Sequence, residues 1–313
     1  MQKIDGGEGL VKKLLLILWN GLFSLTGRLA DLFFLVKDFF YKLFTKAPKV
    51  MSKEESINHI LKSGCSVCRL GDGEIKLIAG RDISFQKACP ELSEKFGSLM
   101  ACEDERLLVC IPDAFSTLQD FESADGLYWK KHLARYRPAW YKYAGADKTY
   151  GNAFISRPYM CFKEKEKAPF YFDLLKKLWK GRQLVIIEGE KTRFGVGNDL
   201  LEGAAGIERI LGPSSQAFTH YDQLLDCAKK SDKSKLIIIA LGPVASLLAF
   251  ELAALGYQAL DLGNLDTEYE WYLRACTEKQ PIKGKLVYEA GGDTGVGPCL
   301  DKNYESQIIA KIF

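Results

Sequence analysis

The sequence predicts an α/β fold: a Rossmann-like, mostly parallel sheet with helices on both faces, preceded by an N-terminal amphipathic helix. Two observations predict the sheet. Short, continuously apolar runs such as residues 184–188 and 235–241 are typical of strands buried on both faces, and helical stretches separate such runs. A third observation predicts the leading helix, because apolar residues recur every three or four positions before residue 50.

Length and composition limit the class of protein. The chain has 313 residues, which is one large domain or two ordinary domains of about 150 residues each. Hydrophobic residues make up 47% and charged residues 27%, as in a globular protein with a substantial core. The net charge of +3 lacks the strong basic excess of a dedicated nucleic-acid binder, so we expect no nucleic-acid partner.

Residues 11–44 carry the amphipathic pattern. The excess of positive over negative charge belongs to residues 1–50. The longest uninterrupted apolar run, residues 14–19, is far shorter than the ~20 residues that cross a bilayer, and no small-residue cleavage site follows. Two interpretations stay open. The wide, phenylalanine-rich face favours a helix in the membrane interface, and the alternative is a helix packed against a partner copy in a homo-oligomer. We expect a domain boundary near residue 50, dividing the chain into residues 1–50 and 51–313.

The elements of the globular part follow from their start and stop residues. Ser52 is expected to cap a helix that runs to about Lys62 and ends at Gly64. Strands are then expected over residues 65–70 and 107–111, the second ended by Pro112. The remaining predicted elements are a helix over 168–180, strands over 184–188 and 235–241, a helix over 244–255 closed by Gly256, and a strand over 257–262.

The cysteines indicate the redox compartment. There are nine, an odd number, and their irregular spacing suggests no disulfide framework. A reduced cytoplasmic location is therefore expected. Cys65 and Cys68 form a lone CxxC without a second pair, so two small residues on a strand are favoured over a zinc or redox site.

The loop after the first predicted strand holds a charged cluster. Ligands of open parallel sheets bind where the carboxyl ends of the strands meet, so this loop is a candidate site. Gly71 and Gly73 allow a tight turn beside a ligand. Asp72 and Glu74 stand two residues apart and can share one cation, although an ordinary acidic turn has the same composition. Arg69 precedes them.

A glycine-rich loop follows the strand at 184–188. Gly195, Gly197 and Asn198 are expected to lead into a helix, with Lys191 and Arg193 beside them. Backbone N–H groups and a helix N-terminus in such a loop bind phosphate. The loop lacks the GK[ST] ending of a P-loop and the last glycine of GxGxxG. The alternative to a phosphate-binding loop is a helix N-cap preceded by ordinary loop glycines.

A second acidic pair, Asp266 and Glu268, follows the strand at 257–262. Hard carboxylate oxygens suit Mg²⁺ or Mn²⁺, and both ions bridge diphosphates. Two acids beside a phosphate loop would repel the ligand without a metal between them. This favours a metal site over the alternative, in which one acid caps a helix and the other is solvated. Only three histidines and no GxSxG are present, so triad and histidine-rich metal chemistry find little support. The missing GxGxxG argues against a nicotinamide or flavin enzyme.

Taken together, these motifs resemble the bacterial GT-D-type glycosyltransferases of adhesin and polysaccharide glycosylation clusters. The resemblance covers about residues 52–313 and rests on CRLGDGE (68–74), FISRPY (154–159), EGEKTRFGVGNDL (188–200), LGP (241–243), GNLDTEYEW (263–271) and YESQIIAKI (304–312). It implies a Rossmann-like fold, a UDP-sugar donor and a divalent metal, Mn²⁺ or Mg²⁺, held by a D-x-E motif. One departure is Gly263-Asn264, where the family usually has Gly-His.

The resemblance also implies roles for individual residues. Asp266 and Glu268 are the favoured metal ligands, and Asp72-Gly73-Glu74 is a second D-x-E that stays open. The nucleotide or acceptor pocket would be lined by Arg69, Gly71, Gly73, Arg157, Arg193, Gly195, Gly197, Asn198 and Gly242. Asp72 or Glu74 would deprotonate the acceptor hydroxyl if the later pair holds the metal.

The predicted function is transfer of a hexose, with glucose favoured, from a UDP-sugar to a hydroxyl of a lipid-linked or protein-linked acceptor glycan. Such a step belongs to surface polysaccharide or glycoprotein biosynthesis. The enzyme would be cytoplasmic and peripheral on the inner face of the cell membrane. The alternative is a catalytically silent nucleotide-sugar-binding module that docks other glycosylation enzymes through its N-terminal helix.

Overall fold

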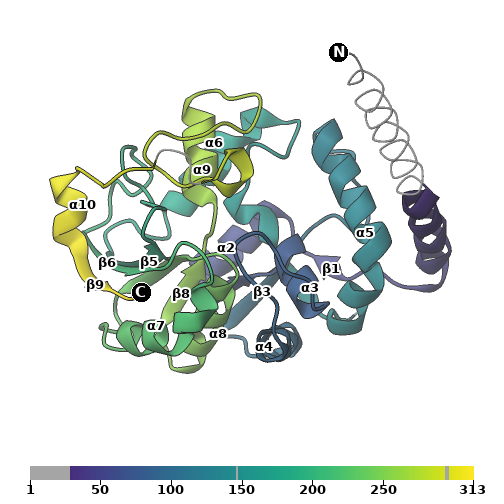
Figure 1. Ribbon diagram of the computed structural model, residues 1–313, viewed down its shortest axis with the longest axis horizontal. Coiled ribbons are helices and arrows are strands. Elements are labelled where there is room, and N and C mark those ends of the chain that lie inside the picture. Colours follow the sequence, from purple (N-terminus) through teal and green to yellow (C-terminus); the bar gives the residue numbers. More distant parts are fainter. Residues whose placement is uncertain (1–28, 146, 293–295) are drawn as a thin grey trace, which may run out of the picture.

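A nine-stranded sheet forms the centre of the molecule (Figure 1). The computed structural model describes residues 29–145, 147–292 and 296–313. The strand order is β1-β4-β3-β2-β8-β7-β5-β6-β9, and every pairing between these strands is parallel. The strands are β1 (Lys49–Val50), β2 (Ser66–Arg69), β3 (Leu107–Ile111), β4 (Thr149–Asn152), β5 (Gln183–Gly189), β6 (Gly206–Gly212), β7 (Leu236–Ala240), β8 (Gln258–Asp261) and β9 (Ile308–Lys311).

Helices cover both faces of the sheet. Along β7, Ile237 and Ile239 join one buried cluster while Ile238 joins the cluster on the opposite face. The helices of the folded body are α2 (Lys53–Ser63), α3 (Asp72–Ile78), α4 (Pro90–Ala101), α5 (Ser123–Tyr143), α6 (Ala168–Lys176), α7 (Tyr221–Ala228), α8 (Val244–Ala254), α9 (Leu265–Leu273) and α10 (Lys302–Gln307). The predicted doubly covered parallel sheet is confirmed.

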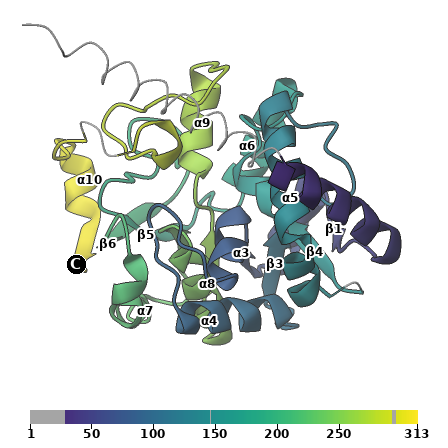
Figure 2. The same cartoon turned by 45° about the vertical axis from the view of Figure 1, so that its right-hand side comes forward.

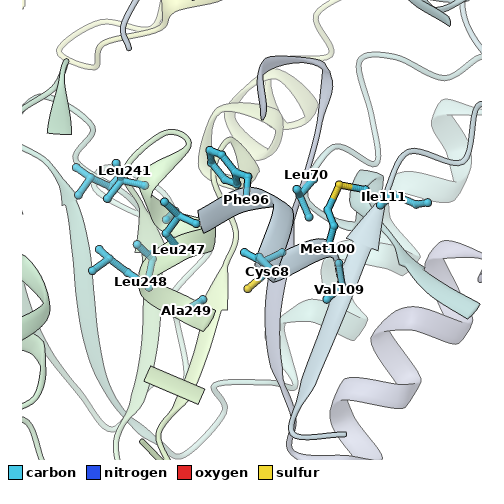
Figure 3. Close-up of a cluster of buried hydrophobic side chains, with 14 of the residues drawn as sticks. Cys68, Leu70, Phe96, Met100, Val109, Ile111, Leu241, Leu247, Leu248 and Ala249 are labelled. Carbon is cyan, nitrogen blue, oxygen red and sulfur yellow. The ribbon is translucent and has the colours of Figure 1, made fainter. Parts of the chain in front are cut away.

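One of the two cores lies between the sheet, α4 and α8. Figure 3 shows Phe96 of α4 beside Leu247 of α8, and Met100 of α4 nearer to Cys68 of β2. All four side chains are at most 1% exposed. β2 and β8 are neighbours in the sheet. β3 and β4, which follow β2 in the chain, lie on one side of this pair, whereas β7, which precedes β8, lies on the other side. The topological switch point of the sheet is therefore between β2 and β8. Ligands of open α/β sheets bind at such a point.

The predicted elements agree with the structure to within a few residues, with one exception. The strand at 107–111 matches β3, and the helix at 168–180 ends earlier, at Lys176 of α6. Ser52 caps α2 through a capping box with Glu55, and Gly64 ends it with φ +68°. The exception follows the glycine-rich loop, where residues 200–203 form turns instead of the expected helix. Asn198 there accepts a hydrogen bond from the N–H of Leu200, which closes a local turn.

A further helix over residues 29–44 lies outside the sheet and beside α5 (Figures 1 and 2). The rest of the predicted amphipathic segment, residues 11–28, lies outside the described residues. Within the described part of the chain, no helix has both the length and the apolar character to cross a membrane. The expected boundary near residue 50 falls at β1, the edge strand that pairs with β4.

Candidate functional site

A cavity of about 1090 Å³ opens at the carboxyl ends of the strands. Its walls come from the loops after β2, β5, β7 and β8, from the start of α5, and from residues 277–289, which follow α9. The cavity therefore lies at the topological switch point, where a parallel sheet is expected to bind its ligand. Its volume is at the upper end of the range for small-molecule sites, which leaves room for two substrates.

Arg69 stands at the end of β2 and is held in place by β8. Its Nη2 donates to Oδ1 of Asp261 at 2.7 Å, and its Nε donates to the backbone carbonyl of Asp261 at 2.7 Å. The hydroxyl of Ser246 donates to the other carboxylate oxygen at 2.7 Å. The guanidinium lies directly under Gly263, where a Cβ would be 2.1 Å from Nη2. Arg69 is therefore a fixed cation on the cavity wall.

Asp72 and Glu74 begin α3 and line the same cavity. Asp72 accepts hydrogen bonds at Oδ2 from Lys76, at 2.6 Å, and from the hydroxyl of Tyr128. Burial opposes ionisation of Asp72, but these two bonds outweigh it and hold its pKa below the usual value. Glu74 accepts the N–H of Gly71 at Oε2, at 2.6 Å, and burial raises its pKa to about 7. These contacts engage one oxygen of each carboxylate.

Arg157 provides a second cation at the cavity. Its Nη1 and Nη2 donate to Glu289, and Nη1 lies 3.9 Å from Oε1 of Glu268. Glu289 also contacts Lys279 at 3.0 Å and accepts from the side-chain amide of Asn264 at 3.1 Å. Burial opposes ionisation of Glu289, but Arg157 and Lys279 outweigh it and lower its pKa. The segment after α9 is thereby fastened over the cavity by ion pairs.

Asp266 and Glu268 are the favoured metal ligands of the sequence, and both are buried on α9. Asp266 accepts at Oδ1 from the N–H of Gly195 and from Asn198, and at Oδ2 from Lys285 at 2.7 Å. Glu268 accepts two backbone N–H groups at Oε2, from the turn at residues 159–160. Its Oε1 has no hydrogen bond, and Arg157 is the nearest described cation.

This arrangement does not fit a metal between Asp266 and Glu268. Both oxygens of Asp266 are occupied by N–H donors, one of them the ammonium group of Lys285. A divalent ion there would have to displace one buried cation and would face a second, Arg157. Burial raises the pKa of both carboxyl groups, and Lys285 and Arg157 act against that rise as their counter-ions.

The first D-x-E fits a hard cation better. Asp72 and Glu74 both reach the cavity, and each keeps one carboxylate oxygen outside the hydrogen bonds described above. Burial, together with the neighbouring carboxylates of Asp261 and Asp72, raises the pKa of Glu74, so a nearby cation would favour its ionised form. Across the described residues, no cluster of three or more His, Cys, Asp or Glu forms a complete protein cage. A cation here would need further oxygen atoms from a bound ligand. Mg²⁺ is commonly coordinated in this way, by one or two carboxylates and the phosphates of a substrate.

The glycine-rich loop differs from its expected role. Arg193 turns away from the cavity and donates to the carbonyls of Gly284, at 2.5 Å, and Gly297. Gly195 and Asn198 donate to Asp266, and neither they nor Gly197 line the cavity. Gly189 and Thr192, at the start of the loop, do line it. The loop is thus fastened to α9 and to the C-terminal segment, because carboxylate and carbonyl acceptors there engage its polar groups.

The remaining expected residues reach the cavity. Arg69, Gly71, Gly73, Arg157 and Gly242 all contribute to its wall. Gly242 has φ +57°, and a Cβ there would be 3.2 Å from the ring of Phe85, so glycine suits this turn. Sequence reasoning missed Asp261, Lys279 and Glu289. Asp261 is a charged residue inside an apolar strand, a signal that could have been used, whereas Lys279 and Glu289 come from a segment without periodicity.

Aromatic side chains form two parts of the wall. Tyr128 and Trp129, from the first turns of α5, lie on the side of Asp72. Phe85 and Tyr288 lie against each other with ring centroids 4.7 Å apart, on the side of Gly242. Flat apolar faces of this kind pack against sugar rings and bases. The cavity therefore combines fixed cations, carboxylates and aromatic faces.

Comparison with known proteins identifies what this architecture is similar to. The model of the family described as "Glycosyltransferase GT-D fold" matches residues 67–290. A "Probable glycosyl transferase Gly" of Streptococcus gordonii is 38% identical over 264 residues, which are 84% of this chain and 39% of that protein. "Glycosyltransferase GlyD" of Streptococcus pneumoniae is 37% identical over 265 residues, 84% of this chain and 32% of that protein. The chain thus spans about a third to two fifths of these curated relatives.

Solved structures give the same result. One is described as the highly conserved domain of unknown function 1792 with a distinct glycosyltransferase fold; it is 38% identical, with a TM-score of 0.82 over 84% of this chain and 95% of that one. A second, described as a new glycosyltransferase from Streptococcus sanguinis, is 38% identical, with a TM-score of 0.83 over 85% of this chain and all of that one.

Proposed function

The chain belongs to the GT-D glycosyltransferase family, and from that premise we propose that it transfers a hexose from a UDP-sugar to a hydroxyl of an acceptor glycan. Glucose is the favoured hexose. The observation that carries the proposal is the cavity at the switch point, whose wall is shared by Arg69, Arg157 and the carboxylates of Asp72 and Glu74. Fixed cations beside carboxylates suit a reaction in which a diphosphate leaves and a hydroxyl attacks.

Arg69 and Arg157 are proposed to hold the donor diphosphate. Both guanidinium groups are already oriented by carboxylates, Asp261 for Arg69 and Glu289 for Arg157. An oriented cation loses little side-chain entropy on binding and needs no reorganisation as charge builds up on the departing UDP. The glycine backbone at residues 71, 73 and 242 supports this role, because it allows the phosphates to approach the chain closely.

Asp72 and Glu74 are proposed as the ligands of Mn²⁺ or Mg²⁺. When bound, such an ion compensates the negative charge of the diphosphate. The hydrogen bonds to Lys76 and Tyr128 keep Asp72 ionised and orient it. The acceptor-activating role that the sequence suggested for this pair depended on a metal at Asp266 and Glu268, which the geometry disfavours. We therefore assign Asp266 to holding the glycine-rich loop against α9.

The acceptor is proposed to enter on the side of α5. Tyr128 is 44% exposed and adjoins Asp72, so its ring is available to a sugar at the mouth of the cavity. The acceptor would be a lipid-linked or protein-linked glycan of surface polysaccharide or glycoprotein biosynthesis. The nine free cysteines support a reducing, cytoplasmic location. Enzymes that use lipid-linked acceptors work at the membrane surface, so we propose peripheral attachment to its inner face.

Thermal unfolding of the full chain tests the proposal first. UDP, GDP, ADP and NAD are each added with Mn²⁺ or with EDTA. A ligand at 100 times its Kd raises stability by about 2.7 kcal/mol, which a melt detects. We expect a shift with UDP that disappears in EDTA, followed by UDP release when a UDP-hexose and an acceptor glycan are supplied. A shift with NAD alone would contradict the proposal. Binding of UDP-sugar without UDP release from any acceptor would instead favour the silent binding module.

A further inference from the structure

The helix over residues 29–44 turns its apolar side chains outward. Eight large apolar residues on its free face are between 49% and 84% exposed: Leu29, Leu32, Phe33, Val36, Phe39, Phe40, Leu43 and Phe44. They follow the 3-4 spacing of a single helical stripe. Contiguous apolar patches of this kind mark interaction surfaces in proteins that are otherwise folded. We call this set the outer stripe.

The opposite face of the same helix, which holds both of its acidic residues, is bound to α5. Asp38 is 7% exposed and accepts from Nε of Arg137, itself 1% exposed, at 2.6 Å. Two turns earlier, Asp31 contacts Arg135 at 2.7 Å and Lys131 at 3.0 Å. An ordinary surface helix buries its apolar face and leaves the charged face to water. This helix instead leaves most of its large apolar side chains exposed. Its ion pairs with α5 fix which face points outward, together with Phe34 and Tyr41, which contact Arg135 and Tyr141.

The charges beside the outer stripe identify its partner. Both acidic residues of the helix, Asp31 and Asp38, are engaged with α5. Lys37, Lys42 and Lys46 remain exposed around the stripe. A surface with large apolar side chains and lysines at its borders fits anionic lipid, because the side chains enter the interface and the ammonium groups meet the headgroups. In a symmetric pair of copies, the same lysines would approach each other across the contact.

We propose that the outer stripe binds the surface of an anionic lipid bilayer, with the helix lying in the plane of the interface. The exposed apolar residues run along one side of the helix and the other side is paired with α5, so the helix lies parallel to the membrane surface. Helix α5 connects this surface to the cavity, since Tyr128 and Trp129 line the cavity while Arg135 and Arg137 hold the amphipathic helix. Figure 2 shows the amphipathic helix beside α5, so bilayer binding would bring this wall of the cavity towards the membrane surface.

The test is co-sedimentation of the full chain with vesicles. Two compositions are used: pure phosphatidylcholine, and phosphatidylcholine mixed with phosphatidylglycerol. We expect binding to the mixed vesicles and a loss of about tenfold or more in the double variant Phe33→Ser/Phe40→Ser. A matched control is Phe170→Ser/Phe313→Ser, which removes two exposed phenylalanines elsewhere, 46% and 58% exposed. Lys37→Glu should weaken binding to the mixed vesicles only.

Two outcomes would overturn the inference. Equal vesicle binding by the wild type and the Phe33→Ser/Phe40→Ser variant would mean that the outer stripe does not attach the protein to membranes. The second outcome is that light scattering finds a dimer for the wild type and a monomer for the same variant, and that vesicles are not bound. The stripe would then be the contact with a second copy of the chain. The UDP-dependent melting shift of the variant is measured in parallel. It should equal that of the wild type, so a failure of this inference is distinguishable from a failure of the proposed sugar transfer.

Discussion

Nη2 of Arg69 lies 2.7 Å from Oδ1 of Asp261, and this ion pair joins the ends of β2 and β8 at the switch point. The side chains of the pair are 13% and 3% exposed. Gly263 closes the loop over the guanidinium with φ +33°. The cation that we assign to the donor diphosphate is thus positioned by a strand that is adjacent in space and distant in sequence.

Replacement of Gly263 by alanine should displace Arg69. The new Cβ would meet Nη2 at 2.1 Å, far inside contact distance, and the positive φ is itself unfavourable for alanine. We expect UDP affinity to fall by about tenfold, which corresponds to one lost charge-assisted contact of about 1.4 kcal/mol. Isothermal calorimetry with UDP and Mn²⁺ measures the change. Gly181→Ala is the control, because φ is +72° there with open space around the Cβ and no cavity nearby. If both variants bind UDP like the wild type, Arg69 does not contact the donor.

The two D-x-E pairs should respond differently to loss of one carboxylate charge. Asp72→Asn should abolish the Mn²⁺-dependent part of the UDP melting shift and leave the melting temperature without ligand close to that of the wild type, because Asp72 is partly exposed. Asp266→Asn should leave the buried Lys285 with less counter-charge and destabilise the fold by about 3 kcal/mol. The folded Asp266→Asn protein should still show the Mn²⁺-dependent shift. The reverse pattern would return the metal to Asp266 and Glu268.

The contacts of Arg193 make it a structural residue in our assignment. Its guanidinium donates to the carbonyls of Gly284 and Gly297 and connects the glycine-rich loop to the C-terminal segment. Arg193→Ala should lower stability by about 2 kcal/mol, since the buried Arg193 side chain and its two charge-assisted hydrogen bonds are lost. UDP binding to the folded protein should change less than twofold, a negligible free-energy difference. A large loss of UDP affinity with unchanged stability would restore the phosphate-binding role expected from the sequence.

The sequence predicts the parts of this molecule that depend on local pattern. Residues 107–111 and 235–241 were identifiable because a strand buried on both faces is apolar throughout. Arg69 and Asp72 were found because cavity residues follow strand ends. The pairing of Asp266 with Lys285 was not predictable, because it joins α9 to a later irregular segment. Glu289 was missed for the same reason, since tertiary packing alone brings it to Arg157.

His132 should make the protein sensitive to acid. It is 5% exposed on α5, and its Nε2 accepts from the indole N–H of Trp140 at 3.2 Å. Burial lowers its pKa to about 4 from 6.5; Asp72 attracts the protonated form and Lys76 opposes it. Because the folded state resists protonation, the stability associated with the neutral ring is complete above pH 6.5. It is lost progressively as the pH falls from 6.5 towards 4, by about 3 kcal/mol in all.

Urea unfolding at a series of pH values measures this loss. His132→Gln keeps an acceptor for Trp140 but cannot be protonated in this range, so its stability should fall less steeply between pH 6.5 and 4 than that of the wild type. Exposed His59, on α2, is the control, and His59→Gln should follow the wild-type curve. Parallel curves for the wild type and His132→Gln would mean that the ring is protonated in the folded state. The hydrogen bond from Trp140 would then be lost, because a protonated imidazole cannot accept the indole N–H and the indole nitrogen is a donor only.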